Sequence, residues 1–334
     1  MGLKRLDTED FVVSADAITA TVWTGDTPKL ETFFTSSTQA ASDSGKYYLN
    51  VYNTGSNLSG SQVQFDITYG HVQGSGSEYY NSAIVGKSPT RSIYGQYRTL
   101  VLGDEYGSFI FGNFTGSDFY AITLERERYK ESLLPGSLTL TLEGALGTIN
   151  LTDDSQVTNT VVFKDAGRVY NLVSGSGGTV NTTNANGWSA NYGSYGWMLP
   201  DIGVLILNPT ALSQSIGLEP TTAANVAGNN PAKLYSAINN LTPNFTLNSQ
   251  ETITSDFVFI RARNAEFNYS ENPSYISGST GEVLYSYFIN SPQSYITTVG
   301  MYNDSNELVA VAKLSKPLKK DFTKEALIRV KLDF

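Results

Sequence analysis

Apolar and polar residues alternate in several stretches of the chain, and this alternation predicts β-strands. The clearest examples are residues 63–69, 138–142 and 328–334, where aliphatic and aromatic residues occupy every second position. Because successive side chains of a strand point to opposite faces, each stretch would place its apolar set on one face of a sheet. Other apolar runs predict further strands at residues 46–52, 108–124, 161–163, 169–172, 204–207 and 257–260.

The end of the chain predicts a hairpin followed by one more strand. Apolar stretches at residues 296–301 and 308–312 flank a turn-forming cluster, NDSN, at residues 303–306. We expect Pro317 to end the second strand of this hairpin, because proline cannot donate to a ladder. The closing strand would then bury Phe334, so that the chain ends inside a sheet rather than in a frayed tail.

Helical signals are fewer and shorter. Residues 88–103 begin with Ser-Pro, which suits a helix start, and end on glycine; between them Ile93, Tyr97, Leu100 and Val101 follow helical spacing. A second short helix is expected after Asn230-Pro231, and one or two helical turns within residues 126–134. The pattern as a whole predicts an all-β dominated fold of the β-sandwich type with two or three short helices.

Residues 1–40 contain few apolar residues, and this scarcity sets the expected domain organisation. One interpretation is an N-terminal arm that orders by docking on its own body or on a neighbour; the other is an ordinary N-terminal strand and loop. Residues 41–334 would form a β-rich structural body. If that body is divided, we expect subdomains at about residues 41–150 and 151–334.

Composition limits the classes of function. The formal net charge is −9, whereas gripping nucleic acid by its phosphates needs a basic footprint, so we expect no nucleic-acid partner. The longest apolar run, residues 204–207, is far below the roughly 20 residues that span a bilayer, so we expect no membrane partner. The chain has no cysteine, which excludes disulfides, thiolate metal sites and cysteine catalysis.

The sequence offers little evidence for catalytic residues. His71 is the only histidine, and no Gly-x-Ser-x-Gly motif accompanies it, so we interpret it as a surface or edge residue without a catalytic role. Glu125 and Glu127 alternate with arginines, as in an ion-pair face, and Asp153 and Asp154 are expected in a turn. Paired carboxylates could serve a glycosidase, but sequence cannot place them at catalytic distance. We therefore predict no catalytic residues, no cofactor and no metal.

One oxygen-rich segment could be either a calcium-binding loop or a hairpin turn. Residues 303–307 (NDSNE) offer the oxygen ligands of a calcium loop. They lack the alternating aspartates and the central glycine of an EF-hand, so a hairpin turn is the better account.

Four aromatic residues form the candidate interaction site. A polar stretch at residues 174–187, rich in glycine, serine, threonine and asparagine, predicts a long exposed loop, and Trp188, Tyr192, Tyr195 and Trp197 follow it. Aromatic side chains beside a projecting loop favour a protein contact or a glycan contact. The alternative is that the rings cap the core at the base of the loop.

Several segments resemble one family of proteins. They are residues 264–270 (NAEFNYS), 272–274 (NPS), 295–300 (YITTVG), 306–318 (NELVAVAKLSKPL) and 326–334 (ALIRVKLDF). The resemblance extends to the whole chain, because residues 10–12, 32–37, 128–131 and 135–136 are similar too. In these segments the chain resembles virion structural proteins of contractile-tailed, T4-like phages of marine and cyanobacterial hosts, and most of all a baseplate wedge subunit.

The resemblance implies a non-enzymatic structural role. The expected partners are other phage tail and baseplate proteins, together with further copies of this chain, at least as a dimer in a symmetric assembly. The expected location is the virion tail or baseplate, assembled in the host cytoplasm. Two alternatives remain open: a carbohydrate-binding tail fibre or adhesin, for which Trp188, Tyr192, Tyr195 and Trp197 are the candidate residues, and a glycan-degrading tail enzyme.

Overall fold

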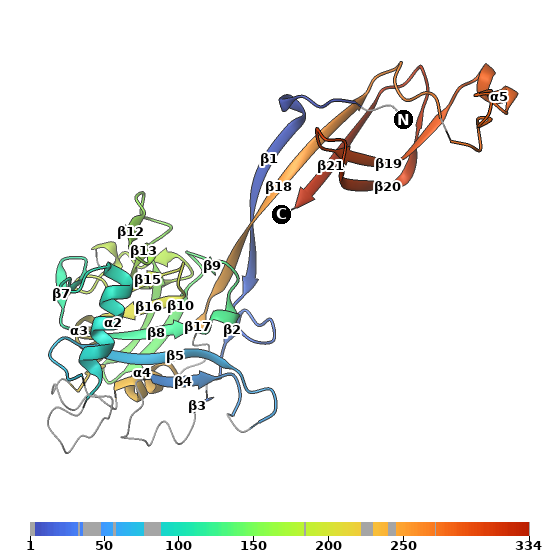
Figure 1. Ribbon diagram of the computed structural model, residues 1–334. Coiled ribbons are helices and arrows are strands. Elements are labelled where there is room, and N and C mark those ends of the chain that lie inside the picture. The colour runs from blue at the N-terminus through green and yellow to red at the C-terminus, as the bar shows by residue number, and fades with distance from the viewer. Residues whose placement is uncertain are drawn as a thin grey trace. The chain divides into compact units, whose positions relative to one another are not determined.

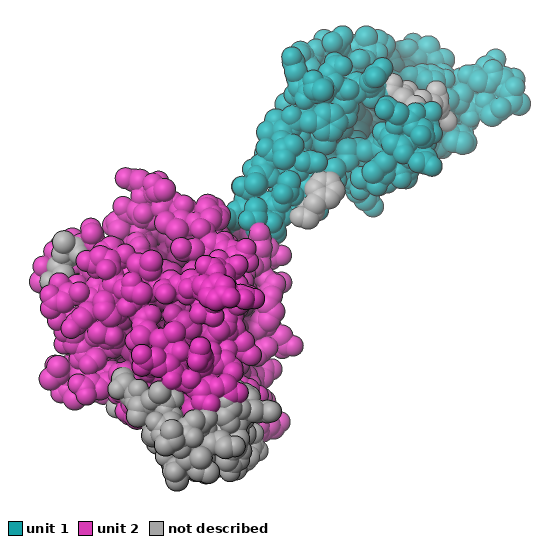
Figure 2. All heavy atoms as spheres, turned by 60° about the vertical axis from the view of Figure 1, so that its left-hand side comes forward, with its two compact units in different colours: residues 1–17, 252–334 teal, residues 18–251 magenta. Residues whose placement is uncertain are grey.

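The protein is dominated by antiparallel strands, which confirms the predicted all-β class. The computed structural model describes residues 4–32, 34–35, 48–55, 58–76, 88–183, 185–221, 230–239, 245–270 and 272–333. The chain forms two compact units: unit 1 consists of Met1–Ala17 and Thr252–Phe334, and unit 2 of Ile18–Glu251 (Figure 2). Both division points fall inside strands, β1 and β18, so the chain passes between the units twice without a loop.

Unit 2 is built on one large sheet, which has thirteen strands in the described residues. The strands on its main path run in the order β2-β17-β10-β11-β13-β15-β16-β8-β5-β4-β3, and all their pairings with printed register are antiparallel. Their bounds are β2 Lys29–Leu30, β3 Phe34–Thr35, β4 Tyr48–Tyr52, β5 Val63–His71, β8 Asp118–Leu124, β10 Thr139–Gly144, β11 Gly147–Asp153, β13 Gly167–Ser176, β15 Gly196–Leu199, β16 Val204–Leu207 and β17 Phe245–Thr246.

Shorter elements complete unit 2. β12 (Val162–Lys164) and β14 (Thr179–Val180) pair with β13, while β6 (Phe109–Phe111) and β7 (Phe114–Gly116) form a separate hairpin. β9 (Ser132–Leu133) pairs with the first residues of β18 (Asn248–Ala262). The helices are α2 (Thr90–Leu102), α3 (Pro209–Ile216) and α4 (Asn230–Asn239), with single 3₁₀ turns at Arg126–Arg128 and Ala185–Gly187.

Both faces of the central strands are buried, and alternation along each strand decides which side chain goes where. In β8, Tyr120 and Ile122 join a cluster with α3 and α4, whereas Phe119 and Ala121 join a cluster with α2. Figure 1 shows α2 against the β5 and β8 part of the sheet. Helices α3 and α4 therefore contribute to the cluster on one face of these strands, and α2 contributes to the cluster on the other.

Two helices follow their sequence signals closely. α2 ends at Gly103 in the left-handed conformation and buries Ile93 and Val101, although Leu100, which we expected on the same face, is 49 % exposed. α4 begins at Asn230 and buries Leu234 and Ile238, as predicted. The segment at residues 126–134 makes one 3₁₀ turn and then enters β9.

α3 was not predicted, although it has a clear start and stop. The Asn208 side chain accepts a hydrogen bond from the Ala211 amide, Pro209 occupies the first turn, and Gly217 ends the helix with φ +70. Asparagine before proline and glycine after the last turn are the residues preferred at helix ends. The signal was therefore present in the sequence at residues 208–217.

Unit 1 contains two small sheets. One has the order β1-β18-β21, with β1 at Phe11–Thr21 and β21 at Ala326–Asp333. The other is the predicted hairpin, β19 (Ser294–Tyr302) with β20 (Leu308–Lys320), and a five-residue helix α5 lies at Ser286–Asn290.

The two predictions for the end of the chain fare differently. β21 buries Ala326, Ile328 and Val330 and exposes the residues between them, as its alternation predicted; Phe334 lies outside the described residues. Pro317, however, does not end β20. The register jumps between the pairs Ile296–Leu318 and Thr298–Lys313, and proline is tolerated at such an irregularity because no ladder hydrogen bond is required of it there.

The long exposed loop expected at residues 174–187 is a hairpin in its first part, residues 174–180. There β13 turns through Gly177 and Gly178, both with positive φ, into β14, and glycine pairs favour such hairpin turns. Within the described part of residues 1–40, β1 pairs with β18, and Trp23 is 2 % exposed in the core of unit 2. This agrees with an ordinary N-terminal strand and equally with an arm docked on its own body. The two compact units divide the chain at residues 17/18 and 251/252.

Candidate functional site

The structure separates the four candidate aromatic residues into two pairs. Tyr195 and Trp197 are 3 % and 5 % exposed and belong to the core of unit 2. The Tyr195 hydroxyl bonds to Ser215 Oγ at 2.9 Å, and the Trp197 ring packs at 5.7 Å and 5.5 Å from Phe109 and Phe111. These two residues cannot contact a partner without unfolding, so the core interpretation holds for them.

Trp188 and Tyr192 are only half-buried and lie at the surface. Trp188 lines a groove of about 390 Å³ together with Asn113, Asn186, Asn191 and the backbone around Gly193. Tyr192 packs edge-on against Phe114, with ring centroids 5.2 Å apart. Asn113, which comes from the turn between β6 and β7, was not among the predicted site residues. The signal was the Gly112-Asn113 pair between two aromatic runs, a typical hairpin turn.

Hydrogen bonds within the loop that carries Trp188 stabilise its conformation. The Ser189 amide donates to the Gly193 carbonyl at 2.9 Å, and the Tyr192 amide donates to Ser189 Oγ at 3.0 Å. Asn208, which is fully buried, donates from Nδ2 to the carbonyls of Tyr192 and Ser194 at 2.9 Å and 3.0 Å. The groove wall is therefore held by hydrogen bonds within unit 2.

His71 is neither at the surface nor at a sheet edge, which corrects the sequence interpretation. It is 7 % exposed at the end of β5, which lies between β4 and β8. Its Nδ1 accepts a hydrogen bond from the Gln73 amide at 3.0 Å, and its backbone pairs with Asp118. The His71 ring lies 6.4 Å from the Tyr69 ring, measured between centroids.

Asp118 and Tyr69 form a buried pair beside His71. The Tyr69 hydroxyl donates to Asp118 Oδ2 at 2.7 Å. Burial raises the pKa of Asp118, and the hydrogen bond from Tyr69 together with the charge of His71 opposes this only in part. Burial also raises the pKa of Tyr69, and Asp118 adds to the effect. Neither groove described here is lined by these residues, so we interpret the pair as structural.

Asp153 and Asp154 also have structural partners, and Glu127 lies 3.7 Å from Arg128 at an exposed position. Asp153 is not in a turn but at the end of β11, fully buried, where it accepts hydrogen bonds from the amides of Gly136 and Ser155. Asp154 accepts from the amide and the side chain of Asn171, both at 2.9 Å. Burial raises the pKa of Asp154 and these hydrogen bonds counteract it.

Residues 303–307 form the predicted hairpin turn. Asn303 Oδ1 accepts from the amides of Ser305 and Glu307 at 3.0 Å and 2.8 Å, and Asn306 has φ 61. The asparagine oxygen is thus used by the turn itself. Within the described residues, no three histidine, aspartate or glutamate side chains are grouped so that they could hold a metal ion. In the same residues, no helix has the length and apolar character needed to cross a membrane.

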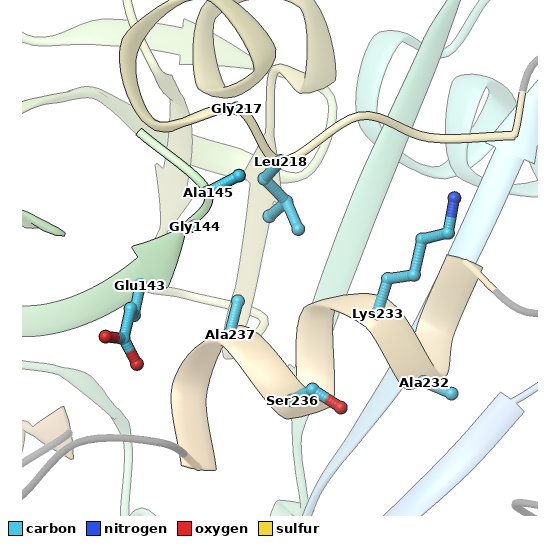
Figure 3. A pocket seen from close by; sticks show the side chains of 9 residues that line it. All are labelled: Glu143, Gly144, Ala145, Gly217, Leu218, Ala232, Lys233, Ser236 and Ala237. Atoms are coloured by element: carbon cyan, nitrogen blue, oxygen red, sulfur yellow. The ribbon is translucent and has the colours of Figure 1, made fainter. Parts of the chain in front are cut away.

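A second hollow, of about 700 Å³, lies between the β10–β11 turn, the end of α3 and α4 (Figure 3). Ala145, Leu218 and Ala237 surround its centre, while the Glu143 carboxylate points away. Lys233 Nζ donates to the Glu219 carbonyl at 3.0 Å and to Thr221 Oγ1 at 2.9 Å. Its charged groups are therefore directed elsewhere, and we assign this hollow no ligand.

Unit 1 presents an unusually apolar surface. Its buried hydrophobic residues are few: Val258, Ala262, Phe288, Ala326, Ile328 and Val330. It holds fewer than a third of the residues, yet more than half of the exposed large hydrophobic side chains in the described part of the chain. They are Phe11, Val12, Val13, Phe267, Tyr269, Leu284, Tyr285, Tyr287, Ile289, Tyr295, Tyr302, Leu308, Val309, Val311, Phe322 and Leu327.

No protein-family model matches the chain, and neither a curated protein nor a solved structure matches it.

Proposed function

We propose that the chain is a non-enzymatic virion structural protein, a baseplate wedge component of a contractile phage tail. In this role it holds neighbouring subunits in register. The sequence resemblance supplies the type of particle. The observation that carries the structural role is the exposed apolar surface of unit 1, which is large for a unit with so small a core.

Exposure of a large apolar surface to water is energetically unfavourable. Isolated soluble proteins rarely expose large contiguous apolar patches, and those they expose often serve as interaction sites. In the β19–β20 hairpin, Val309 and Val311 are 68 % and 58 % exposed, and Tyr295 on the neighbouring strand is 56 % exposed. Val309 and Val311 are exposed and alternate with the less exposed Ala310 and Ala312, so both valines lie on the solvent-facing side of β20. A neighbouring subunit that covers this face would remove it from water.

The segment around α5 adds aromatic anchors to the same unit. Tyr285 and Tyr287 stack with ring centroids 5.4 Å apart, and both are exposed. Tyr275 packs edge-on against Tyr285 at 6.1 Å. Tyrosine is enriched in the residues that dominate binding energy at protein interfaces, because one ring offers both apolar area and a hydroxyl. We expect other tail proteins, and a second copy of this chain, to bind there.

Locating the chain in a particle tests the proposal directly. Purified particles of a contractile-tailed phage that encodes this chain should contain it in fixed proportion to the tail proteins, as measured by quantitative mass spectrometry. Isolated baseplates should retain it. Absence of the chain from purified particles would contradict the proposal, and so would hydrolysis of host polysaccharide by the purified protein.

A matched pair of variants tests the surface. Val309→Lys with Val311→Lys should abolish self-association in sedimentation velocity and prevent incorporation into particles, because two buried charges are costly at an interface. The control, Val161→Lys with Phe163→Lys, changes exposed apolar residues of unit 2 and should behave like the parent. Equal assembly of both variants would show that the β19–β20 face is not an interface.

A further inference from the structure

The groove beside Trp188 has features that the structural role does not use. It lies in unit 2, whereas the apolar surface discussed above belongs to unit 1. Its volume, about 390 Å³, falls within the range of small-molecule sites, roughly 300–1,000 Å³. No lining residue carries a charge. The groove is therefore poorly suited to phosphate or carboxylate ligands, which need cationic partners.

Trp188 provides an aromatic surface that is held in place. Gly112, at the first position of the β6–β7 turn with φ +67, lies so close that a Cβ there would come within 2.5 Å of the indole ring. The ring is only half-buried, so part of it remains available in the groove. A rigid aromatic side chain loses little conformational freedom on binding and presents an electron-rich face.

Three asparagines supply the polar groups of the groove. Asn113, Asn186 and Asn191 are exposed, and their side-chain amides have no hydrogen bond among those found in the described residues. Each amide offers two donors and one acceptor oxygen. Asn186 sits at φ 61 and ψ 11, a left-handed conformation that asparagine tolerates better than most residues. Neutral amides of this kind match hydroxyl groups, which both donate and accept.

The loop between these groups is fixed before any ligand arrives. Ser189 Oγ donates to the Gly193 carbonyl at 3.1 Å, in addition to the backbone bond between the same residues. Gly193 has φ +69, and a Cβ there would come within 1.8 Å of the Phe111 carbonyl oxygen. Pre-organisation of this kind improves affinity because less ordering has to occur on binding.

We propose that this groove binds a neutral saccharide. The weakly positive C–H groups on one face of a sugar ring lie on the face of Trp188, and the ring hydroxyls exchange hydrogen bonds with Asn113, Asn186 and Asn191. An aromatic platform with a few converging polar groups is the usual composition of a small-ligand site. The function added to the chain is recognition of an uncharged glycan, with no bond made or broken.

The first experiment asks whether binding occurs and with which class of glycan. The full chain is applied to an array of neutral oligosaccharides of glucose, galactose, mannose and N-acetylglucosamine, with sialylated and sulfated glycans as the acidic arm. The strongest neutral oligosaccharide is then titrated in solution by tryptophan fluorescence. Trp23 and Trp197 are 2 % and 5 % exposed, so a ligand-induced change reports mainly on Trp188. Binding confined to the acidic arm, or to nothing on the array, overturns the proposal.

The second experiment locates the site. Affinities of the variants are measured by isothermal titration calorimetry, because the Trp188 variants lack the fluorescent reporter. Trp188→Ala should lower affinity about tenfold or more, and Asn113→Ala and Asn191→Ala about two- to tenfold each. Trp188→Phe keeps a ring against Gly112 and should lose less, which separates lost stacking from a disturbed fold. The control Tyr106→Ala removes a ring that is 87 % exposed and outside the groove, and it should bind like the parent. Unchanged affinity in folded Trp188→Ala and Asn191→Ala variants would rule the groove out.

These outcomes are distinct from those of the assembly proposal. Groove variants that lose saccharide binding should still enter particles, and the Val309 and Val311 variant should still bind the saccharide. Failure of one proposal therefore leaves the other standing.

Discussion

Lys320 donates a hydrogen bond from its Nζ to Oδ1 of Asn268 at 2.8 Å, inside unit 1. The lysine is fully buried, and its Nζ also donates to the carbonyls of Asn264 and Asp321, both at 2.9 Å. All three ammonium hydrogens thus have acceptors, which is the condition under which a lysine can be buried. These hydrogen bonds connect the end of β20 to residues 264–268.

Replacing Lys320 should destabilise unit 1. In Lys320→Met the three oxygens stay buried without their donor, and unsatisfied buried groups cost about 1–3 kcal/mol each in mutational data. We expect a lower denaturant midpoint and faster amide exchange in β20. Lys316→Met, an exposed lysine on the same strand, is the control and should stay within about 0.5 kcal/mol of the parent. Equal stability of the two variants would show that the buried ammonium is dispensable.

The closing strand should tolerate change on one face only. Ile328 is 8 % exposed and Leu327 is 67 % exposed, although they are neighbours on β21. Ile328→Ala should therefore cost about 2 kcal/mol of unfolding free energy, and Leu327→Ala less than about 0.5 kcal/mol. Deletion of residues 328–334 should leave unit 1 unfolded, because it removes Ile328 and Val330 and most of the pairing with β18. Unchanged thermal unfolding after the deletion would contradict the assignment of β21 to the core.

Asp66 should make unit 2 less stable at neutral pH. Burial, with a smaller contribution from Glu125, raises the pKa of Asp66 to about 6. The folded state then holds the proton more tightly than the unfolded state, so stability falls as pH rises from about 4 through 6. At pH 8, Asp66→Asn should gain about 1 kcal/mol after solvent screening of the half-buried carboxyl, or roughly 2–4 °C in Tm.

The pH dependence separates this effect from a general gain in packing. At pH 4 the parent carboxyl is largely protonated, so the difference between Asp66→Asn and the parent should vanish. Thermal melts at pH 4, 6 and 8 provide the measurement. Glu105→Gln, at an exposed position, is the control and should show no such trend. A gain from Asp66→Asn that is the same at every pH would disprove the titration account.

Two glycine-to-alanine changes should have opposite effects. At Gly193, φ is +69 and the new Cβ would meet the Phe111 carbonyl, so Gly193→Ala should destabilise the loop and weaken any binding at the groove. At Gly95, within α2, the new Cβ meets nothing within 4 Å. Alanine there should stabilise by about 0.5–1 kcal/mol, because glycine is a poor helix former. Thermal unfolding of both variants measures whether each change raises or lowers stability. If Gly193→Ala raised stability, the loop would have to rearrange to accommodate the new Cβ.

Local patterns in the sequence were enough to predict several elements and which side chains they bury. Alternation in residues 63–69 and 138–142 predicted β5 and β10. Leu140 and Leu142 of β10 are fully buried. The Ser-Pro start and the glycine end predicted α2, and the asparagine turn predicted the β19–β20 hairpin. These features depend on neighbours within a few residues, so the sequence contains the information they need.

Other features were decided only when distant segments came together. Trp197 is core because the β6–β7 hairpin brings Phe109 and Phe111 over it, and Trp188 lies at the surface although it is only nine positions away. Asn113 meets Asn186 in one groove, and Lys320 meets Asn268 in one buried network, across long separations in sequence. Periodicity records which residues share a face of one strand or helix, but which element covers that face is set by tertiary packing. The apolar surface of unit 1 and the saccharide groove are therefore properties of the folded chain that no local pattern encodes.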